Sequence, residues 1–324
     1  MKEFIINSND SEQRVDKFIL KICKNLPKSM MYKFIRTKKI KVNNKRCEIS
    51  QRLQVGDKIS MYINDDFFSS MGGKDDTNNN DYNKLSSISK EISVVYEDKN
   101  ILIVNKPIGL VVHADNNNTL DTLINRIKKY LIENGEYNPN EENSFAPALC
   151  NRLDRNTSGL VVCAKNSKSL RSVNQMIKEN RVHKKYLCIV ISKPPKSCDT
   201  LVAYHRKDNK SNLVTIIDTP KTNFKQIITK YRYLKSIGNL HLIEIELVTG
   251  RTHQIRGHMA HIGCNLLGDN KYGDISINKR YKEKYQCLCA YSIEFCPTDS
   301  DYLSYLNGKT FTTKYIPFIK KYHF

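Results

Sequence analysis

The segment NRLDRNTSG, residues 151–159, places a single carboxylate between two arginines in a predicted loop. Apolar runs typical of buried strands precede and follow this loop, so Asp154 would be held on a rigid frame. Loops on rigid frames often carry functional side chains. A carboxylate there could act as a base, a metal ligand or a nucleophile. An Asp between two arginines is more often a surface ion pair worth under about 1 kcal/mol. These residues alone leave both interpretations open.

The neighbouring residues argue against several other carboxylate chemistries. A phosphoryl-transferring DxD pair needs a second Asp where Asn156 stands, and no paired acid for glycoside hydrolysis is supplied locally. His258 and His261 share a helix face near His253, but no obvious third ligand follows, so no metal is predicted. Phosphate-binding and dinucleotide-binding glycine motifs are absent from the sequence, so no cofactor is expected.

Two further motifs offer side chains that could bind an anion or a flat ring. GRTHQIRGH brings Arg251 to the end of a predicted strand and Arg256 one turn into a helix. Planar guanidinium groups suit phosphates and carboxylates. Tyr186 lies in the predicted strand KKYLCIV. A tyrosine in a strand usually belongs to the core, but it could also be a stacking platform for a base.

The formal net charge of +20 on 324 residues favours a polyanionic partner. Lysines and arginines neutralise phosphates and release counterions, so nucleic acid is the first partner expected. Part of the charge has a plainer origin, because the chain is rich in Lys, Asn and Ile. A membrane is not expected, since no lipidation signal occurs and no apolar stretch reaches 18 residues. Ten dispersed cysteines and no signal peptide predict a cytoplasmic protein.

Residues 12–63 are predicted to form a small basic domain of two helices followed by short strands. The first helix is predicted from apolar residues on one face, namely Val15, Phe18, Ile19, Ile22 and Leu26. Ser29 is expected to cap the second helix. A turn at Asn43-Asn44 is expected to join two strands. Residues 64–90 are rich in Asp, Asn, Ser and Gly, which predicts a flexible linker.

The elements that must position the candidate residues lie in residues 91–324. Residues 92–114 are predicted as strand, turn, strand, then a turn at KPIG and a third strand. The loop of Asp154 joins two strands, while Tyr186 lies within another. LHLIEIELVTG is a strand that leads to Arg251, and RTHQIRGHMAHIG is a short helix. Helices and strands mix without strict alternation, so the fold class is predicted as α+β.

In this order, the motifs resemble the RluA family of RNA pseudouridine synthases. The resemblance covers residues 91 to about 297 and rests on YEDKNILIVNKPIGLVVHA, NRLDRNTSGLVVCAK, KKYLCIV, GRTHQIRGHMAHIGCNLLGDNKYG and LCAYSIEFCP. It implies a catalytic domain over 91–324 built on a mixed, largely antiparallel sheet. The segment from RVDKFI to VGDKISMYI resembles the S-four type of RNA-binding domain, which often precedes this catalytic domain.

The resemblance implies that uridine in RNA is isomerised to pseudouridine, the glycosidic bond moving from N1 to C5. Asp154 matches the family's essential aspartate in RLDxxTSG, and Arg152 matches the arginine that fills the gap left by a flipped-out nucleotide. Tyr186 matches the tyrosine that stacks on the target base and helps proton transfer. Arg256 matches the arginine that pairs with the catalytic carboxylate, and Arg251 is expected to contact substrate.

Thr157, in the same motif as Asp154, and Lys106, in the KPIG turn, are added as expected substrate contacts. Asp154 must be ionised to attack, which a neighbouring arginine would favour. It could add to C6 of the base, attack C1′ of the ribose, or act as a base that gives a glycal. A base inside a stem must be flipped out to be reached, at a cost of a few kcal/mol.

Three functions remain to be compared. The first is a pseudouridine synthase acting as a monomer on large-subunit ribosomal RNA, with tRNA as the other possible substrate. The second is a non-catalytic RNA-binding factor for ribosome assembly, and the third is an RNA methyltransferase, which the missing cofactor loop disfavours. The sequence departs from the family pattern at Asn151, where many members have His, at Asn44 in place of Gly, and at RTKKI, where an acid-glycine pair is usual.

Overall fold

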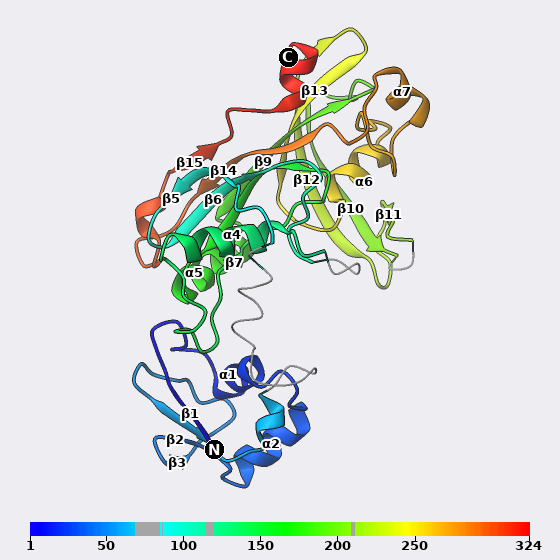
Figure 1. Cartoon of the computed structure of the whole chain (residues 1–324). Helices are drawn as coiled ribbons and strands as arrows, with labels where there is room; N and C mark the ends of the chain where they lie inside the picture. Colours follow the sequence, from blue (N-terminus) through cyan, green and yellow to red (C-terminus); the bar gives the residue numbers. More distant parts are fainter. Residues whose placement is uncertain (69–84, 86, 115–118, 209–210) are drawn as a thin grey trace. The chain divides into compact units, whose positions relative to one another are not determined.

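The structure, a computed structural model, describes residues 1–68, 85, 87–114, 119–208 and 211–324. Most of the predicted linker, residues 69–84 and 86, therefore lies outside the described residues. The chain packs into two compact units, drawn in Figure 1. The segments of the first unit are Met1–Glu91, Ile124–Ala148 and Ala164–Arg171, and those of the second are Ile92–Leu123, Leu149–Cys163 and Ser172–Phe324.

Two helices open the N-terminal part of the first unit, α1 (Val15–Ile22) and α2 (Lys28–Arg36). The expectation that α1 reaches Leu26 is wrong, since the helix ends at Ile22. Leu26 itself is disfavoured in the helical region because Pro27 follows it. Pro27 rather than Ser29 occupies the N-cap of α2, and no side chain caps that end. The apolar faces of both helices pack into one core around the buried Phe18.

A four-stranded antiparallel sheet completes this core in the order β1-β4-β2-β3. Its strands are β1 (Lys2–Ile5), β2 (Ile40–Val42), β3 (Lys45–Arg46) and β4 (Lys58–Met61). The predicted turn at Asn43-Asn44 is confirmed, since both residues take left-handed backbone angles. β1 begins ten residues before the predicted start of the domain. Lys38, within RTKKI, adopts the left-handed conformation that glycine would favour. A short 3-10 helix, η1 (Asp65–Phe67), follows β4.

The remaining strands belong to a sheet of eleven strands, as far as the chain is described. The strands are β5 (Ser93–Glu97), β6 (Ile101–Lys106), β7 (Ala148–Leu149), β8 (Ser158–Ala164), β9 (Val182–Val190), β10 (Cys198–Lys207), β11 (Val214–Ile217), β12 (Lys225–Ile237), β13 (Leu240–Leu247), β14 (Leu288–Phe295) and β15 (Thr310–Thr312). The central order is β11-β10-β12-β13-β9-β14-β8-β6-β5. β14 pairs in parallel with β8 and antiparallel with β9, so the predicted mixed, largely antiparallel sheet is confirmed.

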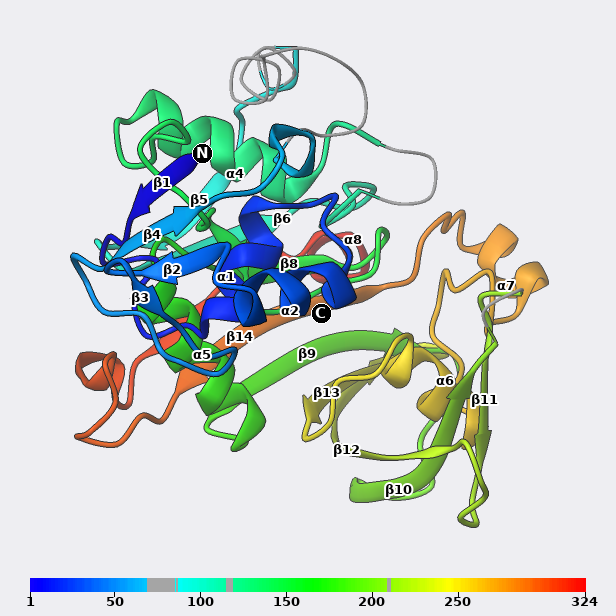
Figure 2. The same ribbon diagram turned by 90° about the horizontal axis from the view of Figure 1, so that it is seen from below.

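Several helices accompany these strands. They are α4 (Leu123–Glu133), α5 (Ser167–Lys178), α6 (Gln254–His261), α7 (Ile275–Arg280), α8 (Pro317–Tyr322) and the 3-10 helix η2 (Ser304–Leu306). The third strand expected after the KPIG turn is wrong, because Val111 makes only an isolated bridge to Thr122. Figure 2 shows β9, β13, β12, β10 and β11 curving into an arc, with α6 packed on its inner side.

The loop of Asp154 is held by hydrogen bonds at both ends. The Asn151 side chain donates to the carbonyl of Leu160 at 3.1 Å and accepts from the amide of Val162 at 2.8 Å. Asparagine thus fulfils a structural role at the position where histidine was expected. At the other end, Gly159 lies against the backbone of Ala290 in β14, where a Cβ atom would come within 2.2 Å of the carbonyl oxygen.

Candidate active site

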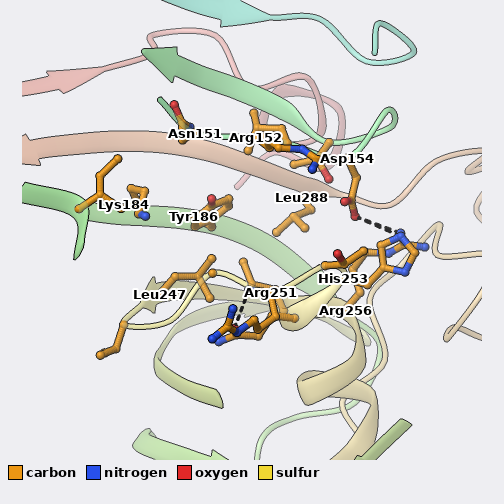
Figure 3. A pocket seen from close by; sticks show the side chains of 18 of the residues that line it. Asn151, Arg152, Asp154, Lys184, Tyr186, Leu247, Arg251, His253, Arg256 and Leu288 are labelled. Atoms are coloured by element: carbon orange, nitrogen blue, oxygen red, sulfur yellow. Dashed lines mark hydrogen bonds and ion pairs between the residues drawn. The ribbon is translucent and has the colours of Figure 1, made fainter. Parts of the chain in front are cut away.

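A cavity of about 400 Å³ opens at the loop of Asp154 and is shown in Figure 3. Its walls come from the loop before β8, from β9, from the turn after β13 and from the start of α6. The polar side chains that line it include Asn151, Arg152, Asp154, Thr157, Lys184, Tyr186, Arg251, His253, Gln254 and Arg256. The structure therefore brings six of the seven predicted site residues to one cavity, Lys106 being the exception.

Asp154 and Arg256 form the ion pair that the resemblance implied. Nη1 of Arg256 donates to Oδ2 of Asp154 at 3.1 Å. The same guanidinium forms a bidentate salt bridge with Asp269, in which Nε donates at 2.7 Å and Nη2 at 2.8 Å. Burial opposes the charge on Arg256, but the hydrogen bonds and charge of Asp269, with those of Asp154, raise its pKa overall. Arg256 therefore stays charged, and its hydrogen bonds to two carboxylates fix the orientation of its guanidinium group.

His253 approaches the same oxygen of Asp154 from another side. Its Nε2 lies 3.8 Å from Oδ2, while its Nδ1 lies 2.9 Å from the hydroxyl of Tyr272. The Tyr272 hydroxyl oxygen accepts a hydrogen bond from the amide N–H of Val214, so the hydroxyl proton of Tyr272 can be donated to Nδ1 of His253. Burial lowers the pKa of His253 to about 4, which makes the ring neutral at pH 7. The hydrogen bonds thus assign the remaining ring proton to Nε2, facing Asp154.

The backbone also sets the position of His253. This residue takes a left-handed conformation, with φ of 52°, at the N-cap of α6. A non-glycine residue held there carries about 1 kcal/mol or more of strain, and such strain gathers at functional sites. The side chain of Gln254, the next residue, accepts a hydrogen bond from the amide N–H of Arg251 at 3.0 Å and donates one to the carbonyl of Ile228 at 3.1 Å. The side chain of Gln254 therefore connects the turn that carries Arg251 to β12 by hydrogen bonds.

Tyr186 lies on the wall of the cavity and is 5% exposed. Burial and the charge of Asp154 raise the pKa of its hydroxyl above the usual range, so it stays protonated. Arg152 and Arg251 line the cavity with exposed side chains, as expected of residues that meet a polyanion. Thr157 is buried beneath the loop, where its hydroxyl accepts a hydrogen bond from Gln286 at 3.2 Å.

The expectation that Lys106 contacts substrate is corrected by its position. Its side chain is fully buried and does not line the cavity. The ammonium donates to the carbonyls of Pro107, Leu110 and Arg155 at 2.8–3.0 Å. Burial lowers its pKa to about 7, against the opposing pull of Asp154. Lys106 therefore links the KPIG turn to the loop of Asp154 through hydrogen bonds to backbone carbonyls of both segments.

The histidines considered as metal ligands have other partners. His258 is buried, with Nδ1 3.0 Å from the hydroxyl of Thr229, and His261 pairs with Asp218. Within the described ranges, no group of three or more potential ligands is placed to hold a metal ion. The same ranges contain no helix long and apolar enough to cross a membrane.

Sequence reasoning missed four residues of the site: Asp269, His253, Gln254 and Lys184. Asp269 lies within GDNKYG, a segment that carries part of the resemblance but suggests no role for its carboxylate. The signal for His253 was its position between Arg251 and Arg256 rather than its spacing from other histidines. Nothing in the local pattern marks Lys184 apart from Lys185, because only the pleat of β9 decides which one faces the cavity.

A cavity that gathers one anchored carboxylate, a buried tyrosine and several cations defines an enzyme site suited to a nucleotide. Comparison with known proteins gives the particular class. The family model described as RNA pseudouridylate synthase matches residues 100–261, and the S4 domain model matches residues 13–59. The chain belongs to the RNA pseudouridine synthase family and is an isomerase with an N-terminal S4 domain.

Relatives of nearly full length share this assignment. An uncharacterized RNA pseudouridine synthase of Mycoplasma genitalium, MG370, is 30% identical over 98% of this chain and 97% of its own. Ribosomal large subunit pseudouridine synthase C of Buchnera aphidicola subsp. Schizaphis graminum is 33% identical over 93% of this chain and 95% of its own. Human RNA pseudouridylate synthase domain containing 4 shares the fold, with a TM-score of 0.54 over 70% of this chain and 90% of its own, at 22% identity.

Proposed function

We propose that the protein isomerises specific uridines of large-subunit ribosomal RNA to pseudouridine, with Asp154 as the catalytic carboxylate on a flipped-out nucleotide. The observation that carries this proposal is the anchoring of one oxygen of Asp154. Oδ2 is bound by Arg256 and faced by His253. Oδ1 has no hydrogen-bond partner among the described residues, so it is the oxygen free to react.

The other cavity residues supply the remaining requirements of the reaction. Tyr186 offers a buried ring on which the uracil can stack, and its protonated hydroxyl can exchange a proton. Arg152, two residues from Asp154 and exposed, can fill the space that the nucleotide leaves in its stem. Arg251 is placed to meet a phosphate, while Thr157 acts through the loop that it supports. Addition to C6, attack on C1′ and glycal formation all begin from the same ionised Asp154.

Ribosomal RNA is the proposed substrate for two reasons. The relative from Buchnera aphidicola is named for the large ribosomal subunit. The basic S4 domain adds a second attachment point, which suits a large structured RNA. We propose that residues 12–63 bind RNA as a separate domain, joined through residues 64–90 to the catalytic domain 91–324. We further propose a monomer in the cytoplasm, since ten cysteines dispersed along a chain of this length suit a reducing compartment.

The test is a map of pseudouridines in cells with and without the protein. Carbodiimide treatment followed by primer extension is expected to show one or a few stops in large-subunit rRNA that disappear without it. Wild-type protein restores these stops, whereas Asp154→Asn, which keeps the shape but removes the charge, does not. An rRNA pattern that stays unchanged on deletion contradicts the ribosomal substrate. Restoration by Asp154→Asn contradicts the role of the carboxylate.

A further inference from the structure

Lys184 is a cation in the cavity that the proposed reaction has not yet used. It lies two residues before Tyr186 on β9, so both side chains leave the same face of the strand, about 6–7 Å apart. Both line the cavity. Figure 3 shows Lys184 beside Tyr186, on the side away from Asp154. The cavity thus has a carboxylate at one end, an aromatic ring in the middle and an ammonium at the other.

The ammonium of Lys184 has no carboxylate or carbonyl partner among the described residues. Burial lowers the pKa of Lys184, and no neighbouring anion opposes this effect. A cation withdrawn from water without a partner is costly to the folded protein. Such a position is typical of a group whose partner arrives with the substrate.

We propose that Lys184 is a further catalytic residue, whose ammonium donates a hydrogen bond to a carbonyl oxygen of the uracil as negative charge develops on the ring. This inference rests on the proposed function and deepens it. Figure 3 places Lys184 on the far side of Tyr186 from Asp154. A base stacked on Tyr186 with its glycosidic bond near Asp154 would therefore direct the opposite edge of its ring towards Lys184. That edge carries a carbonyl oxygen.

The chemistry requires a stabilising group at this edge. When the N1–C1′ bond breaks, its electron pair stays on the ring and is shared with O2 and O4. C5 then uses this pair to bond C1′, C5 releases its proton and N1 gains one, so nothing else is consumed. Addition of Asp154 to C6 also moves charge onto O4. A donor fixed in a site shielded from water stabilises such charge far more than it would in water.

A phosphate of the RNA backbone is the alternative partner for Lys184. Phosphates lie at the outside of a nucleic acid, and the exposed Arg251 is the cation proposed to bind one. Lys184 is half-buried and lines the cavity beside the proposed stacking ring, where a flipped-out base would lie. Its burial therefore favours the base over the backbone.

The experiment compares the full-length protein with Lys184→Met and Lys184→Arg on rRNA from cells that lack the protein. Single-turnover formation of pseudouridine is measured together with RNA affinity at several salt concentrations. Lys184→Met is expected to lower the rate about 100-fold, the usual effect of losing one oxyanion donor. RNA affinity and its salt dependence should stay unchanged. Lys184→Arg should restore part of the rate, since it remains a cation and a donor.

The pH profile gives a second readout. The wild-type rate should fall at alkaline pH as Lys184 loses its proton, at a lower pH than for an ordinary lysine. The same fall should be absent in Lys184→Arg, whose side chain stays charged. The control is Lys185→Met, since Lys185 belongs to the same strand but does not line the cavity.

Three results overturn the inference. One is a Lys184→Met rate equal to wild type, and another is a salt slope smaller by about 0.7, which indicates that Lys184 binds a phosphate of single-stranded RNA. The third is an equal loss of rate in Lys184→Met and Lys184→Arg together with a lowered melting temperature, which would show that Lys184 contributes to packing rather than to catalysis. If the wild-type protein itself makes no pseudouridine, the proposed function fails and this inference fails with it.

Discussion

Asp154 owes its geometry in part to Asp269 and Tyr272, two residues that do not line the cavity. Arg256 reaches Asp154 with one nitrogen because Asp269 holds the other two. His253 faces Asp154 with a proton because Tyr272 occupies its other nitrogen. Arg256 and His253 therefore orient the carboxylate of Asp154 through Oδ2. Oδ1 is left as the oxygen without a hydrogen-bond partner among the described residues. This arrangement places the second carboxylate, Asp269, in a supporting role.

Replacing Asp269 by Asn should damage both stability and rate. Asp269 is fully buried, and its loss leaves the Arg256 charge with one carboxylate partner among the described residues, Asp154. Breaking one side of a buried ion pair typically costs about 3–5 kcal/mol. We expect a lower free energy of unfolding in urea and a single-turnover rate lowered at least tenfold, with RNA affinity retained. Asp274→Asn, which removes a carboxylate charge at the start of α7 while its amide oxygen can still cap that helix, is the control and should leave the rate unchanged.

Two neutral histidines should make the protein less stable in acid. Burial lowers the pKa of both His253 and His258 to about 4, from an unfolded value near 6.5. The unfolded chain therefore binds more protons between these values, and the free energy of unfolding falls as pH drops from about 6.5 to 4. His258 faces Thr229, with His261 and Asp218 as its titratable neighbours.

The measurement is urea unfolding at pH 7 and pH 4.5 for the wild type and His258→Asn. The variant should lose less stability between the two pH values, by an amount of the order of 2 kcal/mol. Comparing differences removes the contribution of carboxylates common to both proteins. Equal losses would show that His258 is not kept neutral by the fold.

At the scale of elements, the site depends on a close approach of β8 and β14. Gly159 pairs with Ala290 in the parallel ladder and has a φ of +118°. A Cβ atom at Gly159 would lie 2.2 Å from the carbonyl oxygen of Ala290 and 2.5 Å from its nitrogen. Both are backbone atoms, so neither can rotate away. The loop that carries Asp154 begins only a few residues before this contact.

Gly159→Ala should therefore separate β8 from β14 and displace the loop of Asp154. We expect a loss of several kcal/mol in the free energy of unfolding, above the roughly 1 kcal/mol that a positive φ alone costs. Gly135→Ala is the matched control, because Gly135 also has a positive φ but open space at the Cβ position. Similar melting temperatures for the two variants would mean that the strands can move apart at little cost.

Much of this element plan could be predicted from the sequence, and the exceptions have physical causes. β8, β9 and β13 carry dense apolar runs that bury against a core. β10, β11 and β12 gave no prediction, because β10 and β12 mix basic and polar residues with their apolar ones and β11 has only four residues. The pairing of Arg256 with Asp269 depends on tertiary structure, which no local spacing reveals. A fully buried lysine such as Lys106 is rare enough that a substrate contact was the natural expectation.

At the scale of the whole molecule, the charge of +20 is the feature most relevant to binding. In the S4 domain, α2 presents three exposed cations, Lys28, Lys33 and Arg36. The buried residues of α2 are the apolar Met31, Phe34 and Ile35, whereas all three cations are exposed, so the cations can be replaced without disturbing the core. A cation that neutralises a phosphate releases a counterion, which makes affinity depend on salt.

Replacing Lys28, Lys33 and Arg36 together by Gln should weaken rRNA binding and flatten its salt dependence. Each cation that no longer neutralises a phosphate should reduce the slope of log affinity against log salt by about 0.7–0.9. The triple variant should therefore lower the slope by about 2, as measured by filter binding between 50 and 200 mM salt. Its single-turnover rate at saturating RNA should stay near wild type, because no cavity residue has changed.

The matched control removes the same charge from elsewhere on the surface. Lys279, Lys314 and Lys320 are exposed and lie in the second unit, so their replacement by Gln lowers the net charge equally. If binding follows net charge alone, both triple variants will lower the slope alike, because a diffuse positive field does not depend on where each charge lies. If α2 contacts the RNA, only its variant will lower the slope. An equal effect therefore argues against the S4 domain as a specific RNA clamp.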